Sequence, residues 1–483
     1  MEFNRSRLII AALRGGSGKT VVSIGLAAAW RRFLGLRIVP FKKGPDYIDA
    51  GWLGVAAAHP CYNLDPFLMK PEEILRSFVR HSGLGDAGLI EGNRGLYDGV
   101  DANGSYSTAE LAKLLRCPVV LVLDATKMTR TAAALVLGCQ MLDPEVGIAG
   151  VILNQVAGMR HERVLRESIE KYCKVPVLGV VPKESWNFFP ERHLGLVPPQ
   201  EAEDIAGALS HAADRMRECL DLDALWKIAG SAGPLGRPLP AAEQRKCSAP
   251  VRIGIVRDAA FQFYYPENLE ALEDRGAVLI EISSFEKAPL PDLNALYIGG
   301  GFPETHLEVL SENSIFRESV RSAIEAGLPV YAECGGLMFL CRGIHHSGRF
   351  YPMAGVFPFG ITLGPKPQGH GYTVMECVNA NPFFGKGSVI KGHEFHYSRI
   401  TDKLDPGSYP FVFKMSKGHG IVAGYDGICY KNSLAGYSHI HAVGNEDWAD
   451  AMIAAAQNNK SDNFGMSAGS GIDPEPVFSE SHG

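Results

Sequence analysis

The chain has 483 residues, of which 46% are hydrophobic and 21% are charged, and these are ordinary values for a packed globular protein. They exclude a mostly disordered chain, a fibrous repeat and a small disulfide scaffold, and the length predicts roughly two or three folded units. The 47 Lys and Arg residues are outnumbered by 53 Asp and Glu residues, so the formal net charge is −6. Because a basic excess is missing, we do not expect the chain to bind nucleic acid.

The ten cysteines are scattered, and no two of them form a Cys-x-x-Cys pair. This spacing argues against a zinc ribbon and against a disulfide framework. The N-terminal residues lack a signal-peptide pattern, and no apolar run is long enough to cross a bilayer. We therefore predict a cytoplasmic protein that does not bind a membrane.

Apolar, strand-like runs alternate with helical stretches in the first half of the chain. The expected strands are Leu8–Leu13, Gly35–Phe41, Ala87–Glu91, Pro118–Asp124 and Gly147–Asn154, and the expected helices are Val21–Phe33, Glu72–His81 and Thr131–Met141. This alternation predicts a parallel sheet with helices on both faces.

Residues 229–250 are rich in Gly, Pro and Ala and have no amphipathic period, which is typical of a linker. After them the α/β pattern begins again. Its expected strands are Val251–Arg257, Val278–Ile282, Ala295–Ile298 and Val330–Glu333, and its expected helices are Tyr265–Arg275 and Ser314–Ala326. We predict an α/β protein of two domains, residues 5–228 and 251–455, followed by a disordered tail over residues 456–483.

A glycine-rich loop follows the first expected strand and opens the first expected helix. It reads Gly15-Gly16-Ser17-Gly18-Lys19-Thr20. Glycines let successive N–H groups turn toward a polyphosphate, and the helix N-terminus adds partial positive charge. Lys19 can reach the terminal phosphates and the Thr20 hydroxyl can bind Mg²⁺, although Leu13 stands where the common motif has its first Gly. The loop predicts a site for a nucleoside triphosphate.

Carboxylates follow the next two strands, where open α/β sheets bind ligands. Asp46 and Asp49 come after the second strand, and Glu91 and Asp98 come after the third. Since Mg²⁺ prefers oxygen ligands, Asp46 or Glu91 could complete a Mg²⁺ shell that begins at Thr20. Capping of turns is the alternative role for these carboxylates.

Asn154 ends a later strand, and it either contacts a purine base or forms a turn.

Cys334 lies between a strand and an apolar helical stretch and is followed by two glycines. A nucleophile on such a turn faces outward, and its place at a helix N-terminus favours the thiolate. The N–H of Gly335 can supply half of an oxyanion hole, and the glycine run that contains Gly300 can supply the other half. The other nine cysteines are expected to be small buried hydrophobes.

A thiol nucleophile needs a base, and four histidines are candidates. They are His393, His396, His439 and His441. A metal site at His439 and His441 is disfavoured because the sequence offers no evident third ligand.

These motifs occur in an order that resembles one known family. The segments AALRGGSGKT, FKKGPDYIDAGW, EGNRGLYDG, GGGFPE, YAECGGLMFL, KGHEFHYS and GYSHIH are similar to those of the glutamine-dependent cobyrinic acid a,c-diamide synthases, over about residues 5–445. The resemblance implies a dethiobiotin-synthetase-like ATP domain and a class I glutamine amidotransferase domain. It also implies ATP, glutamine and an anionic tetrapyrrole as substrates. A homodimer is one oligomeric state that it allows.

The resemblance further implies roles for single residues. Cys334 would be the nucleophile that releases ammonia from glutamine, with His439 as its partner and His441 as the alternative. Lys19, Thr20, Asp46 and Glu91 fall on ATP–Mg²⁺ positions, and Asp49 and Asp98 fall where the family holds the substrate carboxylate. The ammonia would displace phosphate from a tetrapyrrole carboxylate that ATP has activated.

The chain departs from the usual motifs at Lys43, Ala50, Asn93 and Arg94. Lys43 and Arg94 add two positive charges beside the expected substrate carboxylate. A second substrate class, sirohydrochlorin or sirohaem, therefore stays open beside cobyrinic acid.

Two hypotheses from other classes are a partitioning-type ATPase switch and a regulator with a relic amidotransferase half. The first leaves the second domain unexplained, and the presence of Cys334 argues against the second.

Overall fold

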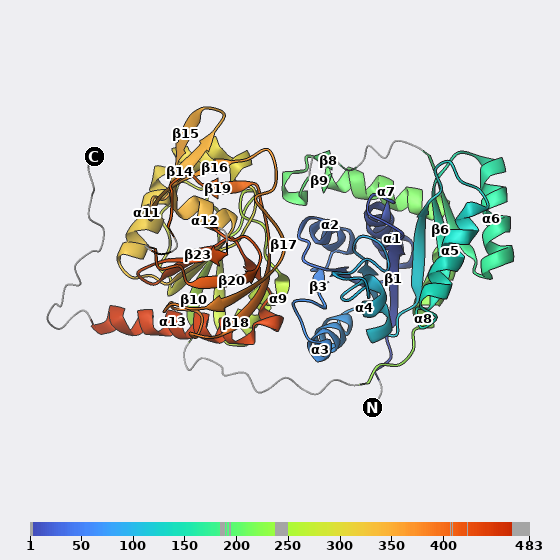
Figure 1. The fold of residues 1–483 in the computed structure, drawn as a ribbon, viewed down its shortest axis with the longest axis horizontal. Helices are drawn as coiled ribbons and strands as arrows, with labels where there is room; N and C mark the ends of the chain where they lie inside the picture. Colours follow the sequence, from blue (N-terminus) through green and yellow to red (C-terminus); the bar gives the residue numbers. More distant parts are fainter. Residues whose placement is uncertain are drawn as a thin grey trace.

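The structure is a computed structural model that describes residues 3–183, 189, 191–192, 195–236, 250–405, 407, 409–422 and 424–465. It forms two lobes that lie side by side (Figure 1). The first lobe holds the N-terminal α/β domain and the second lobe the C-terminal one. Among the described helices, none combines the length and apolar character needed to span a membrane.

A seven-stranded parallel sheet forms the centre of the first domain, with strand order β3-β2-β4-β1-β5-β6-β7. Its strands are β1 (Ser6–Ala12), β2 (Ile38–Lys43), β3 (Tyr62–Leu64), β4 (Ala87–Glu91), β5 (Val119–Asp124), β6 (Ile148–Val156) and β7 (Val177–Pro182). The predicted parallel sheet is confirmed, and the short strand β3 adds an edge that the sequence patterns did not indicate.

Helices cover both faces of this sheet, as predicted. One face packs on α1 (Lys19–Leu34), α2 (Ile48–Ala57), α7 (Ile205–Cys219) and α8 (Leu222–Gly230). The other face packs on α3 (Pro71–Ser82), α4 (Thr108–Leu114), α5 (Thr131–Leu142) and α6 (Met159–Cys173). A small hairpin, β8 (Glu191–Arg192) and β9 (Gly195–Leu196), and the short helix η1 (Pro199–Glu201) precede α7.

The second domain is built on a six-stranded sheet of order β11-β10-β12-β13-β23-β22. Its strands are β10 (Val251–Val256), β11 (Ala277–Ile282), β12 (Ala295–Ile298), β13 (Val330–Glu333), β22 (Ile428–Tyr430) and β23 (Ser433–Gly436). All neighbours in it are parallel except β22 and β23. The helices of this domain are α9 (Pro266–Asp274), α10 (Leu307–Glu312), α11 (Ser314–Glu325), α12 (Gly335–Leu340) and α13 (Glu446–Gly465), with short turns η2 (Pro303–Thr305) and η3 (Ala442–Gly444).

Two further sheets account for the β-rich character of the region after residue 350. One consists of β14 (Cys341–His346), β15 (Arg349–Pro352), β16 (Phe357–Leu363) and β19 (Ser398–Ile400). The other consists of β17 (Gly369–Cys377), β18 (Val389–His396), β20 (Phe413–Lys417), β21 (Tyr425–Asp426) and β24 (His439–Ile440). The second of these sheets faces the first domain, so its side chains are available to a site between the two lobes.

Both expected domain boundaries differ from the packing in the structure. Ala229, Ala232 and Leu235 are buried, and Leu235 pairs with Phe3, so the chain stays on the first domain beyond residue 229. Helix α13 continues to Gly465 across the expected end at residue 455. Its buried apolar residues recur at helical spacing as far as Ala456. Most of the expected linker, residues 237–249, and residues 466–483 of the expected tail lie outside the described residues.

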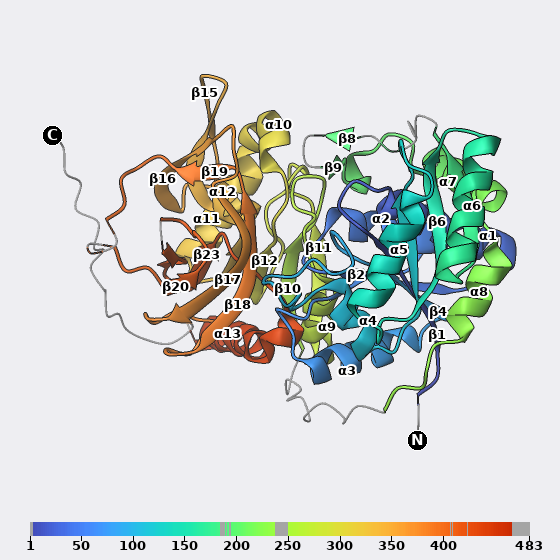
Figure 2. The ribbon, with the colours of Figure 1, turned by 45° about the vertical axis from the view of Figure 1, so that its right-hand side comes forward.

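Polar contacts between α9 and the first domain join the two domains, and Figure 2 shows α9 where the two lobes meet. Glu270 on α9 accepts a hydrogen bond from Tyr62 Oη at 2.8 Å and lies 2.9 Å from His81 Nε2. Glu267, also on α9, accepts a hydrogen bond from the N–H of Asn63 at 2.9 Å. These contacts dock α9 against β3 and α3, and they hold the carboxyl ends of the first sheet toward the second domain.

We predict that Trp448→Ala destabilises the second domain by about 3–5 kcal/mol, since it removes a fully buried side chain. The Trp448 ring lies 5.4 Å from that of Tyr297 and 5.5 Å from that of Tyr331. Thermal unfolding followed by calorimetry measures the loss. Asp447→Asn, exposed on the same turn, is the control and should shift stability by about 0.5 kcal/mol at most. Equal melting of the two variants would contradict the docking of α13.

Candidate functional site

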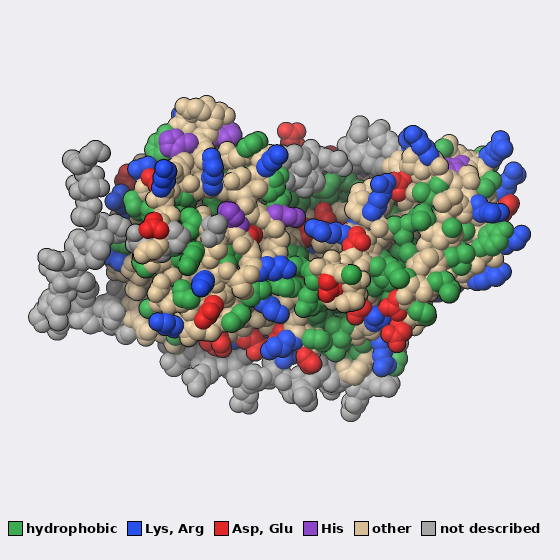
Figure 3. All heavy atoms as spheres, in the orientation of Figure 1, with side chains coloured by type: hydrophobic (Ala, Val, Ile, Leu, Met, Phe, Trp, Pro, Cys, Tyr) green, Lys and Arg blue, Asp and Glu red, His purple; other side chains and the backbone are tan. Residues whose placement is uncertain are grey.

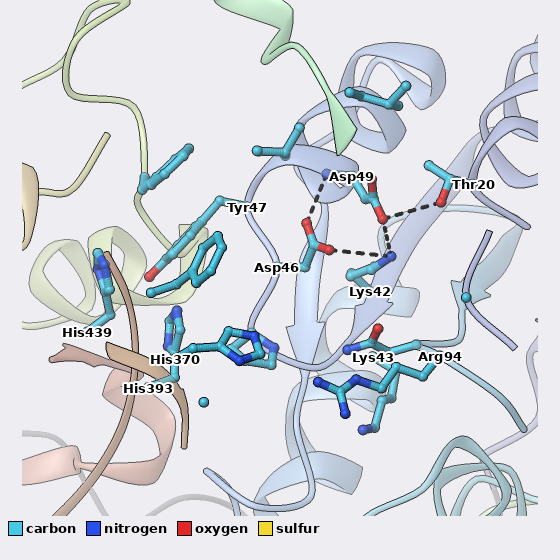
Figure 4. Close-up of a pocket in the computed structure, with 18 of the residues that line it drawn as sticks. Thr20, Lys42, Lys43, Asp46, Tyr47, Asp49, Arg94, His370, His393 and His439 are labelled. Atoms are coloured by element: carbon cyan, nitrogen blue, oxygen red, sulfur yellow. Dashed lines mark hydrogen bonds and ion pairs between the residues drawn. The ribbon is translucent and has the colours of Figure 1, made fainter. Parts of the chain in front are cut away.

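A cavity of about 1560 Å³ lies between the two domains. The phosphate loop, the carboxylates after β2 and the Cys334 turn all contribute to its lining. Figure 4 shows a central part of it, with Lys42, Asp46 and Asp49 on one side and His393 and His439 on the other. Two regions that lie far apart in the sequence therefore line one cavity.

The phosphate loop connects β1 to α1. Gly16 and Gly18 have φ angles of 73° and 88°, and Gly18 is the N-cap of α1. A Cβ on Gly18 would come within 2.2 Å of the Asn154 amide, so this position needs glycine for both space and conformation. Nothing lies within 4 Å of a Cβ built at Gly15 or Gly16, so this part of the loop faces open space. The loop thus has the shape that the sequence predicted.

Asn154 lies against the phosphate loop. Its Nδ2 donates to the Ser17 carbonyl at 2.9 Å, and its Oδ1 accepts from the N–H of Gln155 at 3.0 Å. The amide therefore braces the loop from the end of β6. Contact with a purine base stays a prediction.

Lys42 is surrounded by three carboxylates. Its Nζ lies 2.6 Å from Asp49 Oδ2, 3.0 Å from Glu91 Oε1 and 3.7 Å from Asp46 Oδ2. The Lys42 side chain is almost fully buried, and the three carboxylates outweigh this burial and hold its pKa well above the ordinary value. The sequence indicated Lys42 only as one of several positive groups, because the convergence of β2, β4 and the loop after β2 is not visible in a linear motif.

The carboxylates of this cluster differ in protonation. Burial and the neighbouring Asp49 charge raise the pKa of Asp46 to about 7. The pKa of Asp49 is lowered, because the attraction of Lys42 exceeds the opposing effect of burial. Burial raises the pKa of Glu91, against the attraction of Lys42. Asp46 is therefore the group in this cluster that exchanges a proton near neutral pH.

Thr20 meets this cluster from the phosphate loop. Its Oγ1 donates to Glu91 Oε1 at 2.7 Å and lies 3.3 Å from Asp49 Oδ2. Glu91 Oε2 is buried and has no hydrogen-bond partner among the described residues. Hard cations bind such oxygens, so these groups fit a Mg²⁺ ion that a nucleotide would complete. We expected Asp49 at the substrate carboxylate, and the structure places its Oδ2 beside Thr20 and Lys42.

The other residues that we expected to bind the substrate also line this cavity, and they differ from one another in exposure. Lys43 is buried, whereas Arg94 and Asp98 are exposed. Burial lowers the pKa of Lys43, and the Arg94 and Lys42 charges act in the same direction. Asp98 accepts a hydrogen bond from the N–H of Gly95 at 2.8 Å, so it also caps a turn.

Cys334 is the N-cap of α12, and its backbone angles are φ 48° and ψ −97°. A positive φ in a residue with a Cβ is strained, and such strain is typical of a nucleophile turn. Burial and the charge of Glu304 raise the pKa of the Cys334 thiol, against a smaller opposite effect of the Gly335 N–H. The expected preference for the thiolate is thus outweighed by burial, and the thiol needs a base when it reacts.

Gly335 and Gly300 lie on either side of this turn. A Cβ on Gly335 would lie 3.1 Å from the N atom of Gly301, and a Cβ on Gly300 would lie 2.4 Å from the His439 ring. Both positions therefore have little space for a side chain. The glycine run after β12 thus approaches both Gly335 and His439, as an oxyanion hole in this position requires.

His439 lines the cavity together with Cys334. Its Nδ1 lies 3.4 Å from Glu333 Oε2, and Glu333 accepts hydrogen bonds from Tyr297 Oη and from the N–H of Ile440 at 3.1 Å each. A carboxylate fixed in this way can orient the ring. His441 is fully buried, its Nε2 lies 3.6 Å from Glu267 Oε1, and it is absent from the cavity lining.

The other two candidate histidines also line the cavity, but neither has a ring nitrogen beside Glu333. His393 stacks on His439 with ring centroids 4.9 Å apart, and its pKa is lowered by burial and by the neighbouring histidines. His396 stacks on Tyr437 at 3.6 Å, and its Nδ1 lies 2.8 Å from the Ser398 carbonyl. Among the four histidines, His439 therefore has the surroundings that best suit a base.

Tyr47 is a site residue that the sequence patterns did not single out. It follows Asp46 in the first domain, and Figure 4 shows its ring extending toward His439. The centroid of the Tyr47 ring lies 5.0 Å from that of Phe263, 4.7 Å from that of Tyr265 and 5.4 Å from that of His439. A single loop thus contacts both parts of the cavity. The only signal in the sequence is the place of Tyr47 between Asp46 and Asp49.

Comparisons with known proteins agree with this arrangement. Residues 8–196 match a model of the CobQ/CobB/MinD/ParA nucleotide-binding domain, and residues 252–447 match a model of the CobB/CobQ-like glutamine amidotransferase domain. Three proteins named cobyrinate a,c-diamide synthase are similar along nearly their whole length. The protein from Magnetococcus marinus is 44% identical over 93% of this chain and 97% of its own, and the one from Archaeoglobus fulgidus is 38% identical over 94% and 98%. The protein from Methanothermobacter thermautotrophicus is 40% identical over 90% and 96%.

This chain combines the phosphate loop, the Lys42 carboxylate cluster and the Cys334 turn. The two family models match its two domains in order, and the three relatives cover nearly its whole length. The chain belongs to the cobyrinate a,c-diamide synthase family.

Proposed function

We propose that this chain catalyses the ATP- and glutamine-dependent amidation of the a and c carboxylates of cobyrinic acid. The observation that carries the proposal is the single cavity that both a phosphate loop and a cysteine–histidine site line. The names of the relatives support cobyrinic acid as the substrate. A partitioning-type ATPase would use only the first of these two sites and is therefore disfavoured.

In the proposed glutaminase step, Cys334 Sγ attacks the side-chain amide carbon of glutamine. His439 accepts the thiol proton and then gives it to the departing nitrogen, which leaves as ammonia. N–H groups at Gly335 and in the glycine run around Gly300 stabilise the oxyanion that forms before the thioester. Water then cleaves the thioester and yields glutamate. The contact between His439 and Glu333 supports His439, rather than His441, as the base.

In the proposed synthetase step, a tetrapyrrole carboxylate oxygen attacks the terminal phosphorus of ATP, the bond to the β-phosphate breaks, ADP leaves and the carboxylate becomes an acyl phosphate. Ammonia then displaces phosphate from the acyl carbon and leaves an amide. The phosphate loop and Lys19 hold the ATP phosphates. Mg²⁺ would be held by Thr20 and Glu91, with Asp46 or Asp49 beside them, and it would supply charge neutralisation of the phosphates.

We further propose that residues 5–228 and 251–455 contain these two activities and that the reaction takes place in the cytoplasm. The cysteines that the structure describes are all free thiols, which fits a reducing compartment. Homodimer formation stays a prediction.

Wild-type protein with ATP, Mg²⁺ and glutamine should convert cobyrinic acid to a product whose mass carries two amides. A parallel assay with sirohydrochlorin distinguishes the second substrate class, which Lys43 and Arg94 leave open. We expect conversion of cobyrinic acid to be at least about tenfold faster. Faster amidation of sirohydrochlorin would contradict the proposed substrate but not the proposed chemistry.

Cys334→Ala should lose glutamine-dependent amidation by at least about a thousandfold, since its nucleophile is missing. Amidation with ammonium chloride should persist, because free ammonia bypasses the thioester. Mass spectrometry of the tetrapyrrole reads both reactions. Cys429→Ala, which replaces a cysteine outside the cavity lining, is the control. Glutamine hydrolysis at the wild-type rate in Cys334→Ala would disprove the nucleophile.

Lys19→Ala should impair the synthetase step rather than the glutaminase step. We expect amidation to fall by at least about a hundredfold with either glutamine or ammonium, because the phosphates lose a buried positive partner. Glutamine hydrolysis should persist in part. Undiminished amidation would contradict the assignment of the phosphate loop.

A further inference from the structure

Basic side chains from both domains line the cavity. Lys43 and Arg94 come from the first domain, and Figure 4 shows them close together. His370 on β17 and Lys417 at the end of β20 come from the second domain and are exposed. The space-filling view shows Lys, Arg and His side chains gathered on the face where the two lobes meet (Figure 3).

Aromatic and polar contacts across the domain boundary hold this group in place. Tyr372, on β17, donates to Asp65 Oδ2 at 2.9 Å, and its ring stacks on Phe67 at 4.2 Å. Lys417 Nζ lies 5.1 Å from the centroid of the same Phe67 ring. Lys417 is therefore fixed beside the first domain although it belongs to the second, so the basic group exists only when the domains are docked.

These cations lack the anionic partners that balance Lys42. In the part of the chain that the structure describes, Lys43, Arg94 and Lys417 have no ion pair, whereas Lys42 has three. Asp65 is the one carboxylate whose charge acts on Lys43, and its oxygens already accept hydrogen bonds from Tyr372 and from the N–H groups of Phe67 and Leu68. Lys43 is 6% exposed, and a buried cation without a partner is costly. The arrangement therefore favours an anionic ligand.

We propose that Lys417 and His370 of the amidotransferase domain, together with Lys43 and Arg94, bind the peripheral carboxylates of the tetrapyrrole that are not being amidated. A tetrapyrrole carries carboxylates around a wide flat ring, so when one of them reaches the ATP site the others must lie elsewhere. The cavity, at about 1560 Å³, exceeds the roughly 300–1,000 Å³ of an ordinary ligand pocket. The substrate then spans both domains. This inference rests on the proposed function, since it requires a polycarboxylate substrate.

The test measures equilibrium binding of cobyrinic acid to the full chain, without ATP and glutamine, by quenching of tryptophan fluorescence. We expect Lys417→Ala to raise the Kd about tenfold, which corresponds to one lost charge-assisted contact. Lys417→Arg should stay within about threefold of wild type, because it keeps the charge. Lys414→Ala is the matched control, since Lys414 is exposed on the same strand but does not line the cavity. Unchanged thermal midpoints verify folding.

The outcomes separate this inference from the proposed function. If wild type binds cobyrinic acid and Lys417→Ala binds it equally well, the inference is wrong and the proposed function stands. If only sirohydrochlorin binds to wild type, the proposed substrate is wrong, and the same comparison with sirohydrochlorin decides the role of Lys417. Wild type that bound neither tetrapyrrole would overturn both. Weak binding by Lys417→Arg as well would contradict a role for the charge.

Discussion

The burial of the Lys42 ammonium among Asp46, Asp49 and Glu91 is the interaction on which the ATP side of the molecule depends. A buried ammonium is stable only beside compensating charge, so β2, β4 and the loop after β2 must converge. Three carboxylates exceed one ammonium, and the cluster is balanced by Lys19 and by a proton that Asp46 holds up to about pH 7.

The amidotransferase side is built by a different means. The proposed nucleophile, Cys334, has a strained backbone conformation, and the ring of the proposed base, His439, lies 3.4 Å from the buried Glu333. Burial raises the pKa of the Cys334 thiol, so the proposed mechanism needs His439 to accept the thiol proton. Charge pairing shapes the first site and backbone conformation shapes the second. Contacts of α9 with the first domain bring the two sites into one cavity.

The sequence allowed the prediction of features that depend on a few neighbouring residues. The phosphate loop and the Cys334 turn each combine a strand, glycines and a helix within about ten residues, and short motifs of this kind carry their own geometry. Tyr47 was not predicted as a site residue, and Lys42 only as one of several groups that hold anions, because their partners lie 49 positions away for Lys42 and up to 392 for Tyr47. The 3-residue strand β3 and the full length of α13 were missed because docking, rather than local propensity, stabilises them.

Tyr47 has a consequence for how such proteins diverge. Its loop carries Asp46 and Asp49 for one site, and its ring packs on Phe263, Tyr265 and His439 of the other. A substitution that suits a new nucleotide geometry therefore also moves the surroundings of the amidotransferase histidine. In this chain a change in the Tyr47 loop therefore acts on both domains at once, and an exchange of either domain would have to keep a partner for the Tyr47 ring. Fusion of the domains in one chain keeps the matched partners inherited as a pair.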